Sequence, residues 1–291
     1  MSLNDRYIYQ ILTSITSILI NCNKRKTFIT FHILFSPDVK QNTSEILKSL
    51  MNDFSSNLEL IFYDMGDNFM DKIDPRLSQA AYYRILTPIF IDTERILYLD
   101  GDTLTFKDLN DMYQIEFNDN YVLGFLDVLS NEIDYLKIKS EKYINSGVIL
   151  FNLDKIRKDY KIYELIKALN NIFLHCQDQT LINYVFYPKI GRLPSKYVIF
   201  NFLDKKDIEV YLSRIRTKID INELEEALLD PTLIHNVLCL PKIWSSSTKY
   251  NPLFTYCEQR KDCSCEKYRN LFYFYANKTH YYKDIINFLN K

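Results

Sequence analysis

Short apolar runs of strand length alternate with helical patterns along the chain, and this alternation restricts the fold most strongly. Strand-length runs occupy residues 28–35, 58–63, 95–99, 121–126, 143–152 and 232–235. Helical spacing occurs at residues 43–54, 77–91, 160–174, 179–186 and 222–229, and Pro88 predicts an end or kink in the second of these. Strands and helices in succession are typical of a mostly parallel sheet with helices on both faces. We therefore expect an α/β fold of this kind.

The chain contains no internal repeat and no linker rich in Gly, Pro or Ser, so we expect one main domain at residues 1–245. Residues 246–291 are polar and cysteine-bearing, then strongly aromatic. Residues 257–291 carry seven Lys or Arg against four Asp or Glu, a net charge of +3. A basic aromatic segment can rest on a membrane, but a pair of amphipathic helices packed on the domain has the same pattern. We favour a packed helical extension and keep peripheral contact with the inner face of a membrane as the alternative.

The composition excludes several classes of function. Lys and Arg total 36 against 37 Asp and Glu, and the formal net charge of −1 disfavours a general nucleic-acid binder, which carries a basic excess. The chain has five glycines, whereas average usage predicts about twenty. It contains no GxGxxG, GxxxxGKS/T or GxSxG motif. Dinucleotide-binding Rossmann, P-loop and serine-hydrolase functions are therefore not expected.

The six cysteines are scattered along the chain, unlike those of a disulfide-rich secreted protein. Four of them could form a zinc site, but they lack any CxxC pair, so free or buried thiols are preferred; these are Cys239, Cys257, Cys263 and Cys265. No apolar stretch reaches the roughly 18 residues of a transmembrane helix. Residues 7–23 are uncharged but lack the basic start of a signal peptide. The sequence alone thus favours a cytoplasmic protein.

The central motif is Asp100-Gly101-Asp102, which follows the apolar run at residues 95–99. In an extended backbone, residues two apart point to the same side, so both carboxylates can reach one hard cation. Gly101 allows a sharp turn and a close backbone approach. The carboxyl ends of parallel strands are where open α/β sheets bind ligands. The motif therefore predicts a metal site at this edge of the sheet.

Two other interpretations of this motif remain open. Asp and Gly are common residues in a solvated turn after a strand, without any ligand. A haloacid-dehalogenase phosphatase uses an aspartyl nucleophile in an Asp-x-Asp-Gly-Thr pattern. Here Thr103 follows Asp102 directly, so the glycine stands on the wrong side for that pattern, and the motif follows the third strand rather than the first.

Four further segments occur in a fixed order around this motif. They are residues 80–86 (AAYYRIL), 143–148 (YINSGV), 177–179 (QDQ) and 233–244 (LIHNVLCLPKIW). Together with the central motif they resemble glycosyltransferase family 8, the retaining nucleotide-sugar transferases that include bacterial lipopolysaccharide galactosyl- and glucosyltransferases and glycogenin. The resemblance runs from about Asn4 to Trp244. It implies a GT-A fold with a Rossmann-like sheet.

The resemblance also implies a divalent metal, usually Mn²⁺ or else Mg²⁺, held by Asp100, Asp102 and His235. Two carboxylates and an imidazole suit such an ion. Alone, a histidine on an apolar strand is more often a core residue. Lys242 matches the family lysine that contacts the donor diphosphate, although Ile243 replaces the usual proline beside it. Arg84 matches an arginine that neutralises phosphate or supports Asp100.

The sugar side of the site is implied by two more segments. Asn145 and Ser146 match a loop beside the donor sugar, and Gly147 permits that turn. Asp178 and Gln179 match the pair that contacts the sugar hydroxyls and the reacting face. Because an amide is a poor nucleophile, Gln179 favours front-face transfer, in which a donor phosphate oxygen helps to deprotonate the acceptor, over a double displacement. A turn residue at Asn145 and a helix N-cap at Asp178 are the ordinary alternatives.

The amino terminus departs from the family. Residues 3–7 resemble the motif that holds the base and ribose of the donor, which makes Asn4, Asp5 and Tyr7 nucleotide-site candidates. Arg6 replaces the usual ribose-binding asparagine. Family members begin with an apolar strand before this motif, whereas here only Met1 and Ser2 precede it. We therefore expect the first strand to be missing or truncated.

The sequence as a whole predicts a metal-dependent retaining enzyme that moves glucose or galactose from a UDP-sugar to a glycan or lipid-linked glycan acceptor, as in lipopolysaccharide biosynthesis. A degenerate member that binds nucleotide or glycan without turnover is the non-enzyme alternative. No nucleic-acid partner is expected.

Overall fold

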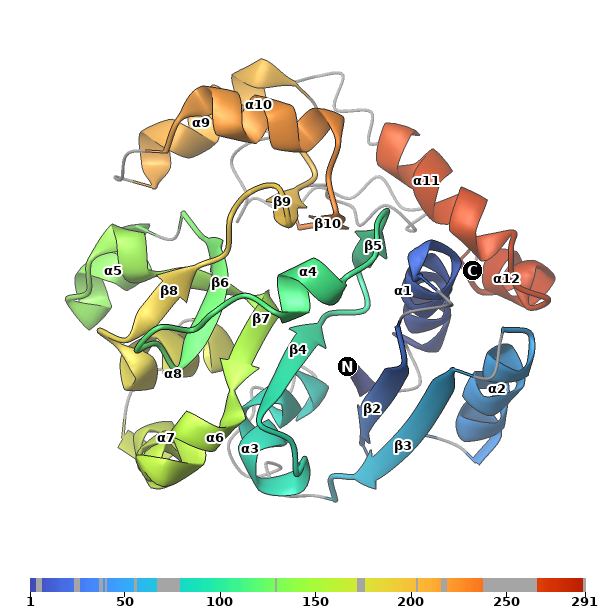
Figure 1. Ribbon diagram of the computed structural model, residues 1–291, viewed down its shortest axis with the longest axis horizontal. Helices are drawn as coiled ribbons and strands as arrows, with labels where there is room; N and C mark the ends of the chain where they lie inside the picture. The colour runs from blue at the N-terminus through green and yellow to red at the C-terminus, as the bar shows by residue number, and fades with distance from the viewer. Residues whose placement is uncertain are drawn as a thin grey trace.

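The computed structural model describes residues 1–3, 7–23, 27–36, 39, 41–54, 57–66, 79–128, 130–171, 176–202, 204–215, 219–237 and 266–289. Three small sheets lie side by side across the molecule, with helices around them (Figure 1). The first sheet has the order β1 (Ser2–Leu3), β2 (Ile29–Phe35) and β3 (Leu58–Asp64), and all its strands are parallel. The first strand, which we expected to be missing or truncated, is present here over two residues, which pair with Leu34 and Phe35.

The second and third sheets are mixed in direction. The second has the order β4 (Arg95–Leu99), β7 (Ile144–Asn152), β6 (Val122–Leu126) and β8 (Ile190–Arg192), and β7 is antiparallel to both of its neighbours. In the third, β10 (Leu233–His235) is antiparallel to β5 (Thr103–Thr105) and parallel to β9 (Val198–Phe200). The expected single, mostly parallel sheet is therefore not found. Apolar runs have the same period of two in either direction, so they do not specify strand direction.

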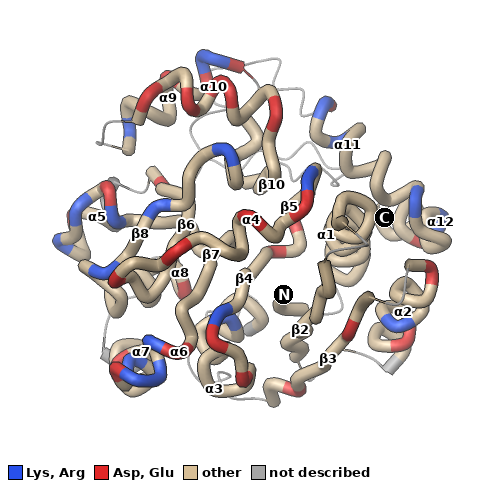
Figure 2. The backbone as a smooth tube through the Cα atoms, viewed as in Figure 1, with Lys and Arg blue, Asp and Glu red and all other residues tan. Residues whose placement is uncertain are grey.

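Both faces of the second sheet are covered, as expected. Along β7, Val148 and Leu150 join one buried cluster, whereas Ile149 and Phe151 join another. The first cluster includes buried side chains of α1 (Ile8–Asn21), α2 (Gln41–Asn52), α9 (Lys205–Arg214), α10 (Ile221–Leu229) and α11 (Glu266–Ala276). The second includes those of α6 (Leu153–Lys158), α7 (Lys161–Asn171) and α8 (Gln177–Phe186). Strands β2, β6 and β7 carry no charged residue, whereas the surrounding helices do (Figure 2).

The prediction of one helix over residues 77–91 is wrong for residues 79–91, which the structure describes. Residues 79–90 form two 3₁₀ turns, Gln79–Ala81 and Tyr83–Leu86, followed by the short helix α3 (Thr87–Phe90). Pro88 stands in the first turn of α3 rather than at the end of a helix. A proline is tolerated there because the first N–H groups of a helix have no intrahelical partner. The short helices α4 (Asn110–Tyr113) and α5 (Ser130–Leu136) complete this half of the chain.

The carboxyl-terminal aromatic residues are used for packing. Helix α11 buries Tyr268, Phe272 and Tyr275, and α12 (Tyr282–Leu289) buries Ile285 and Leu289 in the same cluster as α1. Helix α11 lies along α1, and Phe288 of α12 packs against Tyr9 of α1 (Figure 1). These contacts favour the packed helical extension over the membrane-surface interpretation. Among the described residues, no helix has the length and apolar character needed to span a bilayer.

Candidate functional site at the end of β4

Strand β4 ends at a turn that carries both aspartates of the central motif. The hydroxyl of Thr103 donates to the carbonyl of Asp100 at 2.9 Å and closes the turn. The main-chain N–H of Asn236 donates to the carbonyl of Asp102 at 3.0 Å, and its side-chain amide donates to the same oxygen at 2.9 Å. A Cβ at Gly101 would lie 2.8 Å from Cγ1 of Ile11, so helix α1 packs directly on the turn. The glycine is needed for this close approach.

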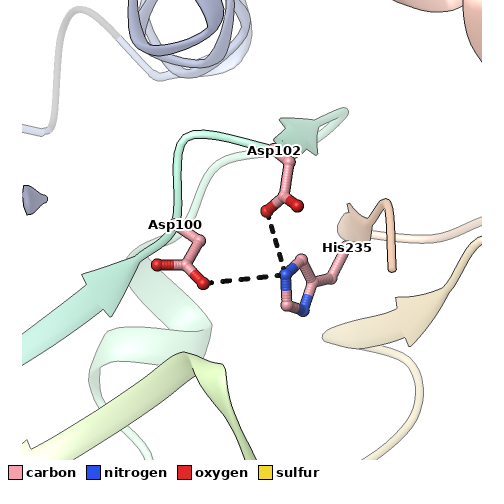
Figure 3. A group of neighbouring side chains, drawn as sticks. All are labelled: Asp100, Asp102 and His235. Carbon is pink, nitrogen blue, oxygen red and sulfur yellow. Dashed lines mark ion pairs between the residues drawn. The ribbon is translucent and has the colours of Figure 1, made fainter. Parts of the chain in front are cut away.

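His235 reaches the turn because β10 pairs with β5. In this antiparallel ladder His235 lies opposite Thr103, next to Asp102 in the chain. Its Nε2 lies 3.0 Å from Oδ1 of Asp102 and 4.0 Å from Oδ2 of Asp100 (Figure 3). One ligand atom from each residue lies within 4.8 Å of the others. Asp100, Asp102 and His235 are called the carboxylate–histidine cluster below.

The space beside this cluster is kept open by a glycine. A Cβ at Gly147 would lie 2.1 Å from Cε1 and 2.6 Å from Nε2 of His235, and 2.7 Å from Oδ2 of Asp100. Any side chain at this position would therefore collide with the ligand atoms. Carboxylate oxygens and an imidazole nitrogen are donors that Mn²⁺ and Mg²⁺ sites accept. The donor set and the glycine together fit a divalent cation.

Arg84 is buried behind the cluster and connects it to Asp178. Its guanidinium pairs with Asp100 through both terminal nitrogens, at 2.9 and 3.4 Å. The Nε atom lies 3.1 Å from Oδ2 of Asp178 and donates to the carbonyl of Ala81 at 2.9 Å. Another bond reaches the carbonyl of Ser146. All three guanidinium nitrogens thus contact protein oxygens, which favours support of Asp100 over a direct contact with phosphate.

The electrostatics of this group follow from burial. Burial disfavours the charged guanidinium, but the carboxylates of Asp100 and Asp178 raise the pKa of Arg84 above its ordinary value. Burial also raises the pKa of Asp178 to about 6, against the opposing charge of Arg84. Its carboxylate also accepts a hydrogen bond from Ser146. Burial therefore favours the protonated form of Asp178 relative to a solvent-exposed aspartate.

Four polar side chains form a network on the other side of Ser146. Gln179 accepts from the N–H of Ser146 at 3.0 Å and donates to Oδ2 of Asp127 at 3.1 Å and to the hydroxyl of Tyr143 at 3.0 Å. Asn145 donates to the same oxygen of Asp127 at 2.8 Å, and it accepts from the N–H of Gly147 at 2.9 Å. Asp127, Tyr143, Asn145 and Gln179 are called the amide network below.

Sequence reasoning missed Asp127, Tyr143, Asn183 and Asn236. Asp127 follows β6 directly, as Asp100 follows β4, and this strand-end position was the available signal. Asn183 is buried and binds Ile144 through both its amide oxygen and its amide nitrogen, at 2.8 Å each, which attaches α8 to β7. Tyr143 and Asn236 lie in two of the segments that carry the family resemblance, but nothing local assigned them a role, because their contacts depend on residues that are distant in the chain.

Several predicted residues lie outside the described part of the chain. They are Asn4, Asp5, Lys242 and the residues around it, and the four cysteines considered for zinc, Cys239, Cys257, Cys263 and Cys265. Tyr7 is described and half exposed; it precedes helix α1, whose Ile11 contacts Gly101. The structure thus brings together Arg84, Asp100, Asp102, Asp178 and His235 from four separate segments of the chain.

The sequence pattern of one protein family covers most of the chain. The pattern described as "Glycosyl transferase family 8" matches residues 1–246. The chain belongs to glycosyltransferase family 8. Members of this family are retaining hexosyltransferases, which use a nucleotide-sugar donor, a glycan acceptor and typically a divalent metal.

Curated relatives come from several bacteria. The chain is 28% identical over 229 residues to a lipopolysaccharide 1,2-glucosyltransferase of Escherichia coli, covering 72% of this chain and 65% of the relative. It is 26% identical over 236 residues to the glycosyltransferase GlyB of Streptococcus pneumoniae, covering 80% and 54%. The matches span between about a quarter and two thirds of the length of these curated relatives.

Solved structures support the fold. The galactosyltransferase LgtC, in complex with donor and acceptor sugar analogs, has a TM-score of 0.66 at 17% identity, with 93% of each chain covered. This likeness gives the chain a GT-A-like α/β fold with partly mixed sheets. The phosphatase hypothesis is not carried further, because the chain belongs to a different enzyme family.

Proposed function

We propose that this chain is a metal-dependent retaining hexosyltransferase that moves glucose or galactose from a UDP-sugar to a glycan or lipid-linked glycan. The convergence of Asp100, Asp102 and His235 beside Gly147 is the observation that carries the proposal. The printed names of relatives support the choice of sugars, since one is a lipopolysaccharide glucosyltransferase and one a galactosyltransferase. We also propose that residues 1–245 form the transferase domain and residues 246–291 an extension of it.

The carboxylate–histidine cluster would hold the cation. A divalent ion there supplies positive charge that offsets the charge of the departing diphosphate. Arg84 would hold Asp100 in place through its bidentate pair. The proposal does not require Arg84 to contact the phosphate as well. Lys242 would contact the diphosphate, and Asn4, Asp5 and Tyr7 would contact the nucleoside, as the family resemblance implies.

The amide network and Asp178 would face the sugar. In the proposed step the bond from the anomeric carbon to the diphosphate oxygen breaks, and the acceptor oxygen bonds to the same face of that carbon. The acceptor proton passes to an oxygen of the departing diphosphate. Gln179 has its amide oxygen and nitrogen engaged by Ser146 and by Asp127 and Tyr143. This engagement suits an orienting role and supports front-face transfer over attack by the enzyme.

The test is release of UDP from a panel of UDP-sugars, with and without Mn²⁺, for the wild type and Asp102→Ala. We expect slow, Mn²⁺-dependent release from one sugar and none in the variant. Asp154→Ala is the matched control, because Asp154 forms an exposed ion pair with Lys158 away from the site. Equal release by Asp102→Ala and the wild type would contradict the proposal.

The degenerate binding protein remains the second candidate function. It rests on two departures from the family, Arg6 and Ile243, which lie outside the described residues. Calorimetry with UDP distinguishes the two functions, because a binding protein would bind UDP tightly while releasing none from any UDP-sugar. Asp100→Asn should abolish metal-dependent turnover and leave the fold intact, and full activity of that variant would also contradict the enzyme assignment.

A further inference from the structure

Helix α1 contains four buried Ser and Thr side chains, which are Thr13, Ser14, Thr16 and Ser17. A buried hydroxyl lowers stability unless it is hydrogen-bonded. In the middle of a helix, its usual partner is a main-chain carbonyl about one turn earlier. Three of the four follow this rule and donate to carbonyls of α1 itself; they are Thr13, Thr16 and Ser17.

Ser14 is the exception among these four, because its partner lies at the turn after β4. Its Oγ lies 3.0 Å from Oγ1 of Thr103. Thr103 has one hydroxyl proton, which it donates to the carbonyl of Asp100 at 2.9 Å. Ser14 must therefore be the donor in the pair with Thr103. Two successive hydrogen bonds thus connect α1 with the main chain of Asp100, a member of the carboxylate–histidine cluster.

The same face of α1 continues along β5 (Figure 1). Strand β5 lies at the end of its sheet and pairs with β10 on one side. On the other side the N–H of Thr105 donates to Oγ of Ser17 at 2.9 Å, and the carbonyl of Thr105 accepts from the amide of Asn21 at 2.9 Å. Residues 14, 17 and 21 are three and four positions apart, so they lie on one face of the helix. Their side chains bind groups that a neighbouring strand would otherwise bind.

The turn between β4 and β5 is therefore held from two sides. On one side the N–H of Asn236 donates to the carbonyl of Asp102 at 3.0 Å. On the other side Ser14 binds Thr103, and Ile11 packs on Gly101. Packing of Ile11 is not directional, whereas a hydrogen bond depends on distance and angle. The bond from Ser14 therefore specifies the position of the turn more closely than the apolar contact does.

This restraint matters because the turn carries two of the three cation donors. One donor atom from each residue of the carboxylate–histidine cluster lies within 4.8 Å of the others. If the turn moved freely, binding would have to order it, and the cost of ordering would lower the affinity for the ion. A turn that is already held in place avoids this cost, so groups that hold it increase the affinity.

We propose that Ser14 is a positioning residue for the metal site. It holds Thr103, and through Thr103 the main chain of Asp100, so that the turn keeps the arrangement of donor atoms that binds a divalent cation. Ser17 and Asn21 hold the following strand on the same helix. The inference rests on the proposed metal-dependent function and adds helix α1 to the groups that support its metal site.

The test is calorimetric titration of the full chain with Mn²⁺, comparing the wild type with Ser14→Ala and Thr16→Val. Thr16→Val is the matched control, because its hydroxyl is also buried in α1 but donates to the carbonyl of Leu12 in the same helix. Each variant loses one buried hydrogen bond, so both should unfold at lower urea concentrations than the wild type. Only Ser14→Ala should bind Mn²⁺ more weakly, by roughly fivefold. Equal Mn²⁺ affinity of the two variants would overturn the proposal.

A second pair of variants tests whether Ser14 acts through Thr103. Thr103→Val removes the hydroxyl that accepts from Ser14 and donates to Asp100. In this background Ser14→Ala should weaken Mn²⁺ binding by less than about twofold, because the two residues no longer share a hydrogen bond. A further loss of roughly fivefold in the double variant would overturn the route through Thr103.

Kinetics separate positioning from general damage to the fold. In UDP release, Ser14→Ala should need roughly fivefold more Mn²⁺ for half its maximal rate, with kcat at saturating Mn²⁺ close to that of the wild type. A lower kcat with an unchanged Mn²⁺ requirement would overturn the positioning role.

The binding measurement also separates this inference from the proposed function, because it needs neither a sugar nor turnover. If the wild type binds Mn²⁺ but releases no UDP, only the transfer reaction is contradicted, and weaker binding by Ser14→Ala still supports the positioning role. A wild type that binds no Mn²⁺ would overturn both.

Discussion

The carboxylate–histidine cluster and the amide network lie on either side of Arg84 and Ser146, yet they are built in opposite ways. In the cluster, two carboxylates and an imidazole converge beside Gly147, where no side chain fills the space next to the ligand atoms. In the amide network, both ends of Gln179 are hydrogen-bonded to protein groups. In the cluster, the carboxylate and imidazole atoms remain available to bind a ligand. In the network, the polar atoms bind one another and fix the positions of the side chains.

This difference has a physical basis. Like charges at short distance repel, so a cluster of carboxylates is stable only with a nearby cation or with an ionic partner such as Arg84. Neutral amides can be fully satisfied within the protein at little electrostatic cost. Substitutions in the cluster should therefore change metal binding, whereas those in the network should change orientation of the substrate. Four experiments test this comparison.

The largest effect is expected where the two regions meet. Arg84→Met leaves Asp100 and Asp178 without their buried cation, and breaking a buried pair lowers the free energy of unfolding by about 3–5 kcal/mol. Urea unfolding measures the change. Lys158→Met is the control, because its exposed pair with Asp154 should contribute at most about 1 kcal/mol. A loss in Arg84→Met no larger than in the control would show that Arg84 does not hold the regions together.

The next substitution acts on the cluster alone. Gly147→Ala places a methyl group against His235 and Asp100, so it should displace the ligand atoms and lower metal-dependent UDP release about a hundredfold. Calorimetric titration with Mn²⁺ should show weaker binding as well. In Gly191→Ala the new methyl group meets Leu123 and Asn120 instead, and activity should be retained. Normal Mn²⁺ affinity in Gly147→Ala would contradict the open-cluster interpretation.

The third prediction concerns the pH dependence of Asp178. Its folded-state pKa of about 6 exceeds the ordinary aspartate value of 3.8, so the folded protein binds this proton more tightly than the unfolded chain. The contribution of Asp178 to stability is therefore largest below about pH 4 and is lost as the pH rises to about 6, a difference on the order of 3 kcal/mol. Asp178→Asn should remove this part of the pH dependence in urea unfolding curves. If the free energy of unfolding of Asp178→Asn changed with pH between about 4 and 6 as it does in the wild type, the raised pKa of Asp178 would be contradicted.

The smallest effect is expected in the amide network. Tyr143→Phe removes a hydroxyl that accepts from Gln179, which should cost about 1 kcal/mol and lower kcat by roughly fivefold with little change in Mn²⁺ affinity. Tyr121→Phe is matched, because its hydroxyl binds Asp159 outside the site. A change of Mn²⁺ affinity in Tyr143→Phe would show that the network and the cluster are not separable.

Strand positions were predictable where the apolar run was long. The runs at residues 28–35, 95–99 and 143–152 match β2, β4 and β7 to within one residue at each end. Strands β5, β8 and β9 have three residues each, too few for a period to be recognised. At residues 79–90, apolar spacing of helical type produces 3₁₀ turns, because the segment is held by its contacts rather than by its own helix propensity.

Part of the candidate site was predictable from residues that are close together in the sequence. Asp100 and Asp102 are two residues apart after an apolar strand, which indicated a shared cation. In the structure a turn closed by Thr103, rather than an extended backbone, carries both residues. Arg84, Asp178 and His235 were named through a resemblance to a family, not through a pattern that specifies their contacts. Asp127 was missed because one aspartate after a strand is also an ordinary turn residue.

By itself, the sequence determined the long strands β2, β4 and β7, the paired carboxylates at the end of β4, and membership of the family. The backbone period and the local spacing of residues set these features. Only the tertiary structure decided that His235 approaches Asp102, that Gly147 keeps the cluster open, and that Arg84 connects Asp100 with Asp178. These contacts join residues far apart in the chain, and they form because strand pairing and burial on both faces of the sheet bring those residues together.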